Sequence, residues 1–328
     1  MRASIVLRAV IASLASSTAC GKLLVDFKGG DEPSKLGAIE LESFNLGDRI
    51  PAGQGGDDVF IKNEEDSDLG MPSLHYKRSA HYRRAEMRIL DHDIQEGQTY
   101  YVGFKFRLAH SRKGLAIFQW KKADKVAAPA QNIPIDLVHS GNDQLTLEYT
   151  TPGGNGSDRS PVWHGPLSSG SGKENVHSVA LAINTDNSGK GWLEFYLDGK
   201  KQKFDNGEER LKDVYLFTGR TYPKIGIYRG ESAQGDESNP EDHTFNSYLY
   251  RAQISDTSLD EIAEAGGLNA SQPEEPTPTG SPEPTSTPLP TSDPPTPTPT
   301  SSPEPKPTCK RSRRSSSSKR SRRSRHRV

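Results

Sequence analysis

Cysteine is almost absent from this chain of 328 residues, which contains only Cys20 and Cys309. Both lie outside the segment that we predict to fold, so no internal disulfide bond is expected there. A domain of about 250 residues can be stabilised by burial of apolar surface alone. The sequence also contains no CxxC, no HExxH and no Gly-rich phosphate loop between a strand and a helix. These absences argue against a zinc site or a nucleotide-binding site of the common kinds.

A long hydrophobic run is missing as well. The most apolar stretch, residues 5–15, follows Arg2, contains Arg8, and is too short and too rich in small residues for a membrane-spanning helix. Small residues at positions 17–19 then offer a cleavage site, which is typical of a secretory signal peptide. We therefore predict that residues 1–20 are a signal peptide and that the protein is secreted without membrane insertion. Cys20 directly after the small residues leaves a bacterial lipoprotein as the alternative.

The C-terminal part has too few apolar residues to form a core. Residues 271–308 consist largely of Pro, Thr, Ser and Glu, which predicts an extended linker similar to an O-glycosylated stalk. Residues 309–328 contain ten Lys and Arg and no acidic residue, although the net charge of the whole chain is −1. Such a block is usually a solvated, disordered tail, which could bind an anionic cell-wall polymer or a membrane surface. A nuclear signal is the competing interpretation, and the predicted signal peptide disfavours it, so no nucleic-acid partner is expected.

Residues 21–270 have a hydrophobic pattern with a period of two. Apolar residues alternate with polar ones over residues 102–108, 144–149, 192–197 and 245–250, and Asp198-Gly199 predicts a tight hairpin turn. Helical periodicity is limited to residues 258–265, where Ser258 and Glu261 form a possible capping box. Many short strands without a strand–helix–strand rhythm predict an all-β fold, namely a β-jelly roll sandwich of two antiparallel sheets. We expect a monomer.

Three strings in this segment combine aromatic, amide and basic residues. They are HYRRAEMR (residues 81–88), FQWK (residues 118–121) and YPKIGIYR (residues 222–229). In each string the pattern predicts a strand that sends His, Gln or Tyr, interleaved with cations, to the face opposite its apolar residues. Aromatic rings stack on sugar C–H groups, and guanidinium groups pair with carboxylates. The strings therefore predict binding of an acidic sugar chain and removal of a carbon-bound proton from it, which is polysaccharide lyase chemistry.

These strings also resemble those of a known family. Residues 21–268 are similar to polysaccharide lyases of the glucuronan lyase type, family 20, a group of secreted fungal enzymes with a β-jelly roll fold. Related alginate lyases carry Arg-x-Glu-x-Arg, Gln-x-His and Tyr-x-Lys-x-Gly-x-Tyr signatures. Residues 84–88 and 222–228 match the outer two signatures, whereas Lys121 replaces the histidine of the middle one. Because the glucuronan lyase resemblance supplies a histidine from His81 instead, it favours glucuronan as the substrate and leaves alginate as the alternative.

The resemblance implies a β-elimination that begins with removal of the proton at C5 of a uronic acid. A neutral amide, Gln119, binds the carboxylate and stabilises the charge that develops there. An imidazole, His81, acts as the base, and a phenol, Tyr228, protonates the departing O4 and is able to act as base as well. The residues expected to bind substrate are Arg84, Arg88, Trp120, Lys121, Tyr222 and Lys224. His75 is the alternative base.

Two other classes of protein are alternatives to a lyase, and one metal site is a candidate. A retaining glycoside hydrolase requires two carboxylates about 5 Å apart, and the Glu-x-Asp-x-x-Glu pattern of one such group is absent. A non-catalytic sugar-binding module requires only the aromatic and basic face. No cofactor is required for the chemistry. A structural Ca²⁺ is possible, with Asp242 as a candidate oxygen ligand.

Overall fold

The computed structural model describes residues 23–43, 49–123, 132–153, 159–217, 219–230 and 243–268. The predicted signal peptide, linker and basic tail lie outside these residues, as does the candidate calcium ligand Asp242. Among the described residues, no helix is long and apolar enough to cross a bilayer.

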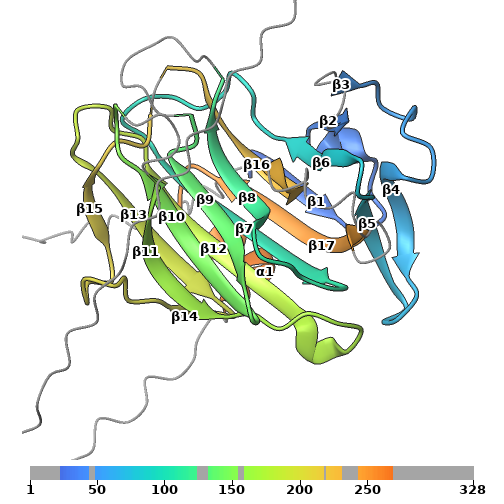
Figure 1. Ribbon diagram of the computed structural model, residues 1–328. Helices are drawn as coiled ribbons and strands as arrows, with labels where there is room; N and C mark the ends of the chain where they lie inside the picture. The colour runs from blue at the N-terminus through green and yellow to red at the C-terminus, as the bar shows by residue number, and fades with distance from the viewer. Residues whose placement is uncertain are drawn as a thin grey trace, which may run out of the picture. The chain divides into compact units, whose positions relative to one another are not determined.

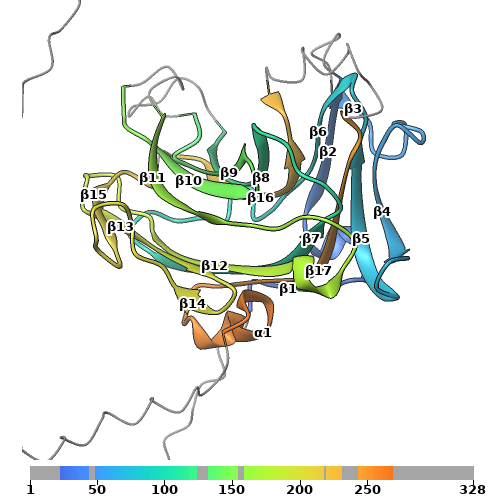
Figure 2. The same cartoon turned by 60° about the horizontal axis from the view of Figure 1, so that its bottom comes forward.

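The described residues form two antiparallel β-sheets that pack face to face (Figures 1 and 2). In the nine-stranded sheet the order is β14 (Lys200–Lys201), β13 (Gly191–Leu197), β12 (Val176–Asn184), β7 (Thr99–Leu108), β17 (Phe245–Ser255), β5 (Met71–Arg78) and β4 (Val59–Asp66), with β1 (Val25–Lys28) paired to β17 and β15 (Leu211–Val214) paired to β13. In the eight-stranded sheet the order is β11 (Arg159–Pro166), β10 (Gln144–Thr150), β9 (Ile135–Gly141), β8 (Leu115–Lys122), β16 (Thr221–Tyr228), β6 (Tyr82–Arg88), β2 (Ala38–Ser43) and β3 (Arg49–Ile50). This is the predicted all-β jelly roll sandwich.

Helical structure is limited to single turns in the described part of the chain. They include the 3₁₀ turns η1 (Pro33–Lys35), η2 (Lys173–Asn175) and η5 (Asp260–Ile262), and the short helix α1 (Ala263–Gly266). The predicted helix near residue 258 therefore exists, but its predicted capping box is wrong. The turn begins after Leu259 without a side-chain cap, and Glu261 accepts a hydrogen bond from the Ser255 hydroxyl instead.

Gly103 on β7 has no room for a side chain because α1 packs closely on it. A Cβ atom there would lie 3.0 Å from the backbone nitrogen of Gly266. The short helix thus covers part of the face of the nine-stranded sheet that points away from the other sheet, which Figure 2 shows from the side.

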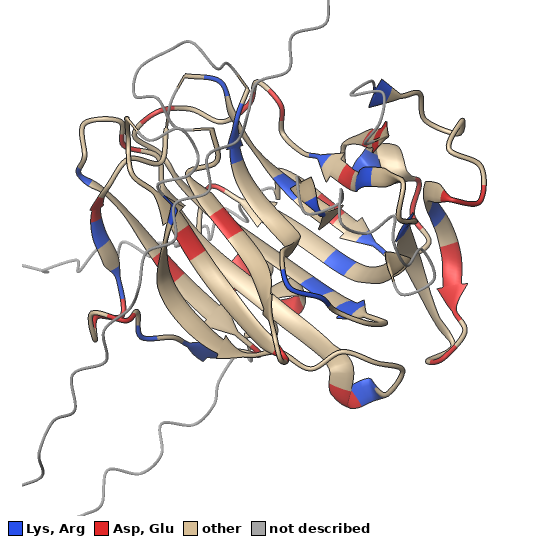
Figure 3. Cartoon of the chain, viewed as in Figure 1, with Lys and Arg blue, Asp and Glu red and all other residues tan. Residues whose placement is uncertain are grey.

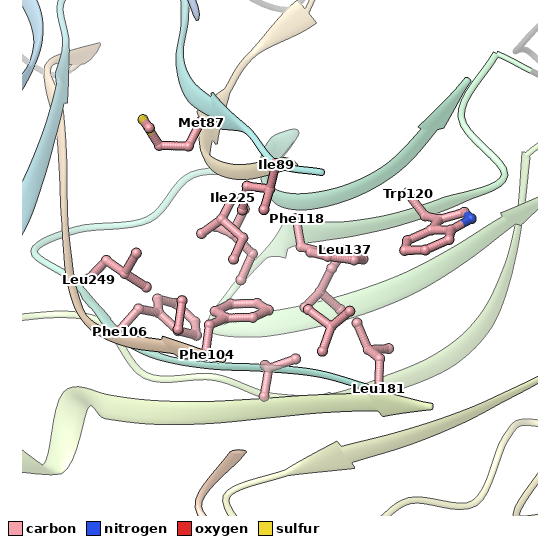
Figure 4. Close-up of a cluster of buried hydrophobic side chains, with 14 of the residues drawn as sticks. Met87, Ile89, Phe104, Phe106, Phe118, Trp120, Leu137, Leu181, Ile225 and Leu249 are labelled. Carbon is pink, nitrogen blue, oxygen red and sulfur yellow. The ribbon is translucent and has the colours of Figure 1, made fainter. Parts of the chain in front are cut away.

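The hydrophobic core lies between the sheets and is built from alternate residues of each strand. Phe104 on β7 stacks on Phe118 on β8, with ring centroids 5.8 Å apart. Trp120 has 0% exposure, its ring points into this core (Figure 4), and its Nε1 donates a hydrogen bond to the Leu216 carbonyl, 2.7 Å away. Side chains alternate between the two faces of a strand, so the core position of Trp120 places its neighbours Gln119 and Lys121 on the opposite face.

Candidate active site

The face of the eight-stranded sheet that points away from the nine-stranded sheet, here called the site face, carries most of the predicted site residues. Ala85, Phe118 and Ile225 belong to the core, and the residues that alternate with them on β6, β8 and β16 therefore project to the site face. Figure 3 shows basic and acidic positions close together on the strands of this sheet.

A row of polar residues crosses the site face from strand to strand. The strand register places Gln119 on β8 directly opposite Lys224 on β16 and Asp136 on β9. The row continues to Arg88 on β6 and to Glu148 on β10. Neighbouring strands lie about 4.8 Å apart, so these side chains are adjacent. Gln119 is therefore the neutral centre of a row that is acidic at one end and basic at the other.

Gln119 is held in place by a buried carboxylate. It has 1% exposure, and its Nε2 donates to Asp136 Oδ1 over 3.4 Å. Asp136 in turn pairs with Arg159, at 2.5 Å between Nη1 and Oδ2. Burial raises the pKa of Asp136 to about 7, and the nearby Glu148 carboxylate acts in the same direction against the opposing effect of Arg159. Asp136 and Arg159 are not among the site residues predicted from the sequence. An acid between the apolar residues Ile135 and Leu137 could have indicated a polar side chain on the face of the strand opposite the core.

Tyr228 lies on the site face at the end of β16, with its ring beneath a cation. The Arg84 guanidinium is 4.7 Å from the centre of the ring, and the two residues are opposite each other in the pairing of β16 with β6. Burial raises the pKa of the phenol more than Arg84 lowers it. The hydroxyl is therefore protonated near neutral pH, which suits a proton donor.

A bulge in β16 sets the position of Tyr228 relative to Gln119. The register between β16 and β8 shifts between Ile225 and Tyr228. Gly226, within this bulge, has φ of 149°, and a Cβ there would lie 2.4 Å from the Ala85 carbonyl oxygen. Only glycine is compatible with this backbone, which explains physically why glycine occupies this position between Lys224 and Tyr228.

Most of the predicted cations are paired with acids. Lys224 forms ion pairs with Glu40 and with Glu86, the latter at 3.3 Å. Arg84 pairs with Glu42 at 2.6 Å and with Glu86 at 3.1 Å. The partners Glu40 and Glu42 were not predicted from the sequence, because only strand pairing brings β2 beside β6.

Arg88 is neutralised in the same way as Lys224 and Arg84. It lies 3.3 Å from Asp91 and 3.8 Å from Glu40. Burial raises the pKa of Glu40, but Lys224 and the neighbouring arginines outweigh that effect and bring the pKa below its ordinary value.

Lys121 differs from the other cations of the site face. Its Nζ donates to the neutral side-chain oxygen of Asn132 at 2.6 Å, and it has no ion pair with any acid in the described parts of the chain. Burial, together with the charges of Lys224 and Arg84, lowers the pKa of Lys121 to about 8. A substantial fraction of this amine is therefore uncharged in mildly alkaline solution.

Three predicted positions differ from expectation. The substrate-binding role of Trp120 is wrong, because its ring is buried between the sheets on the face opposite Gln119. Tyr222 lies on the site face, but it is buried, so its ring is not an open stacking platform. His81 lies in the turn before β6 and is exposed, so it is not on the strand where it was predicted.

The alternative base His75 lies in the other sheet. It is on β5, where its ring nitrogens bond to Glu64 at 2.7 Å and to Asn246 at 2.9 Å. Its ring also stacks on Tyr248, with centroids 4.4 Å apart. His75 is therefore part of a separate polar cluster and does not contribute to the site face.

A basic pocket of about 360 Å³ adjoins the site face. Its lining combines three cations with one acid, one histidine and small residues: Arg112, Lys113, Gly114, Val138, His139, Ser140, Glu148 and Arg229. Val138 is opposite Ala116, which in turn is opposite Tyr228, so the pocket begins two strands away from the tyrosine. Its volume is at the lower end of ligand pockets, about 300–1,000 Å³.

The described residues contain no group of three or more His, Cys, Asp or Glu side chains arranged to hold a metal ion. The predicted calcium ligand Asp242 lies outside them. Nothing on the site face is therefore assigned to a metal.

Comparison with known proteins identifies the family. A family model described as polysaccharide lyase matches residues 53–248, which is more than half of the chain. Solved structures with a similar fold include the endo-β-1,4-glucuronan lyase of the fungus Trichoderma reesei, with 14% identity, a TM-score of 0.49, and coverage of 69% of this chain and 98% of that one. Alginate lyase PA1167 of Pseudomonas aeruginosa has 14% identity, a TM-score of 0.45, and coverage of 69% and 100%. Curated protein sequences gave no match. On the strength of the family match, this chain belongs to the polysaccharide lyase family and is an enzyme that acts on a polysaccharide as a lyase.

Proposed function

We propose that the enzyme cleaves β-1,4-linked polyglucuronate (glucuronan) by β-elimination and leaves a 4,5-unsaturated uronic acid at the new chain end. The observation that carries this proposal is the position of Gln119, a buried neutral amide between Lys224 and Asp136 on a face that also carries Tyr228. An amide donor beside cations stabilises a uronate carboxylate as negative charge accumulates on it during C5 deprotonation.

Tyr228 supplies the proton for the leaving group in this proposal. Its phenol is protonated near neutral pH because burial raises its pKa, and a positioned acid that protonates O4 lowers the barrier to cleavage of the C4–O4 bond. Arg84 stays over the ring during the reaction and stabilises the tyrosinate that forms.

The basic pocket supports an acidic polymer as the substrate. Arg112, Lys113 and Arg229 line it beside the site face, and cations of this kind bind the carboxylates of neighbouring uronate units. Alginate remains the second candidate, since it presents the same carboxylates on a similar chain. The extracellular location follows from the predicted signal peptide and belongs to the same proposal.

A panel of glucuronan, alginate, hyaluronan and heparin tests the substrate. The ultraviolet absorbance of the new C4–C5 double bond should increase most rapidly with glucuronan, whereas hydrolysis or simple binding produces no such absorbance. If alginate is turned over faster than glucuronan, the substrate assignment is wrong and the lyase assignment stands.

Gln119→Ala tests the site itself. It should lower kcat by about 10²-fold or more with a smaller effect on KM, because the amide acts as charge develops. Gln202→Ala, in the turn after β14 where Gln202 donates to the Lys200 carbonyl, is the matched control and should behave as wild type. Turnover of Gln119→Ala at the wild-type rate would remove Gln119 from the mechanism.

A further inference from the structure

The proposed elimination requires a base that reaches C5 while the carboxylate on that carbon is held by Gln119. C5 is bonded to the carboxyl carbon, so the base must project from the same part of the site face as Gln119. The identity of this base rests on the proposed function, since only an elimination requires a group that removes the C5 proton.

Lys121 is positioned for this task. It lies two residues from Gln119 on β8, and alternate residues of a strand project from the same face about 6–7 Å apart. Across the sheet it is opposite Tyr222 on β16. Its side chain is partly exposed, so a bound sugar can contact the amine. The Asn132 side-chain oxygen, 2.6 Å from Nζ, positions the amine without neutralising a charge.

The charges around Lys121 favour the uncharged amine. The groups that act on it are Lys224 on β16, Arg84 and Glu86 on β6, and Glu40 on β2, with Tyr222 and Asn132 as its polar neighbours. The two cations and burial lower its pKa to about 8, against the opposing effect of the two acids. At pH 7 about one tenth of such an amine is uncharged, and at pH 8 about half.

The predicted base His81 is distant from Gln119 by the strand register. Arg88 on β6 is level with Lys224 and therefore with Gln119. His81 precedes the whole of β6, and a strand from residue 82 to 88 extends about 20 Å. Tyr228, opposite Arg84, lies between these two levels. His81 is therefore farther from Gln119 along the sheet than Lys121, which is two residues from Gln119 on the same strand.

We propose that Lys121 is the general base of the elimination. Its uncharged amine takes the C5 proton and becomes an ammonium group, while the electrons of the C5–H bond form the C4–C5 double bond. The C4–O4 bond breaks, and O4 takes the proton of the Tyr228 hydroxyl. The ammonium group then releases its proton to solvent, and the tyrosinate is reprotonated, so that charge and protons balance over one turnover.

The pH dependence of kcat/KM on glucuronan tests this assignment in the unmodified enzyme. An essential base with a pKa of about 8 makes kcat/KM increase with pH, reach half of its maximum at about pH 8 and level above that, since kcat/KM follows the ionisation of the free enzyme. A histidine base would make kcat/KM reach half of its maximum at about pH 6.5 instead. A half-maximal kcat/KM at the lower pH would overturn the proposal.

Lys121→Arg separates a base from a simple carboxylate-binding cation. Arginine retains the positive charge but stays protonated throughout this pH range, so kcat should decrease by about 10²–10⁴-fold with little change in KM. A small primary amine added to Lys121→Ala should restore part of the rate. Lys105→Arg, on β7 of the other sheet, is the control, and a thermal melt of each variant confirms folding.

The outcomes separate this inference from the proposed function. If wild-type enzyme forms no unsaturated product from any uronate polymer, the proposed function itself fails. If wild type and Lys121→Arg form product at the same rate, only the assignment of Lys121 fails. Elimination that is lost in His81→Ala and kept in Lys121→Arg would return the base to His81.

Discussion

Two polar clusters of this protein use the same residue types for different purposes. On the nine-stranded sheet, the fully buried Arg107 makes a two-point contact with Asp66, at 2.8 and 2.5 Å, while the Tyr250 hydroxyl also donates to Asp66. Asp68 lies 2.9 Å from the same guanidinium. The third nitrogen of the Arg107 guanidinium donates to the Gly170 carbonyl, so each of its three nitrogens contacts an oxygen acceptor of the protein.

The site face also buries ion pairs, but it retains polar groups that are not neutralised. Gln119 is a neutral amide beside a carboxylate of raised pKa, and Lys121 is bonded to an amide in place of an acid. Buried charges must be paired to avoid a large desolvation cost, so a shifted pKa and an incomplete pairing mark groups that are available for chemistry. Both clusters bury polar side chains. They differ in that Arg107 is paired with acids, whereas Lys121 is hydrogen-bonded to a neutral amide.

The largest expected effect is on catalysis at the site face. Tyr228→Phe removes one hydroxyl and almost no volume, so the fold should be unchanged while kcat decreases by about 10²–10⁴-fold. Tyr196→Phe on β13, where the phenol donates to Glu194, serves as control in the unsaturated-product assay. Full activity of Tyr228→Phe would show that the tyrosine only positions the sugar and that another group protonates O4.

The next largest effect should be on stability and should come from the other cluster. Asp66→Asn leaves Arg107 with an incomplete pair in a fully buried site, and breaking a buried pair costs about 3–5 kcal/mol of unfolding free energy. Denaturant unfolding measures this loss, and kcat of the folded enzyme should be unchanged. Asp205→Asn breaks a half-exposed pair with His164 and should cost less than about 1 kcal/mol. Equal losses in the two variants would contradict the distinction between the clusters.

The smallest expected effect is on substrate affinity at the basic pocket. Arg112→Ala combined with Lys113→Ala removes two exposed cations, so KM for the polymer should increase with kcat nearly unchanged. The effect should decrease at high ionic strength, because salt screens exposed charges. A decrease in kcat with unchanged KM would place these side chains closer to the reaction than the pocket suggests.

Much of the fold was predictable because one face of a strand packs in the hydrophobic core and the other faces water, so apolar and polar residues alternate along the strand. Alternation over residues 102–108, 144–149, 192–197 and 245–250 corresponds to β7, β10, β13 and β17. The same rule, applied strictly, would have placed Trp120 in the core, since it alternates with Gln119. Its aromatic character suggested a sugar platform, but burial of a large apolar ring determined its position.

The relative positions of site residues were predictable from the sequence only for residues that lie on the same strand. Gln119 and Lys121 share a face because they are two residues apart, and the sequence alone determines that spacing. The two-residue alternation likewise determined the all-β class, and the low cysteine content determined that the core is held by packing. These properties depend on neighbours in the chain.

Only the tertiary structure decided which of these residues act together. Strand order brings Asp136 and Lys224 to either side of Gln119, although they are far apart in the chain. It also places Glu40 in an ion pair with Lys224, whereas Lys121 forms no ion pair with an acid of the described residues. The pKa of a side chain depends on burial and on charges within a few ångströms, and those distances are set by sheet register and not by sequence spacing.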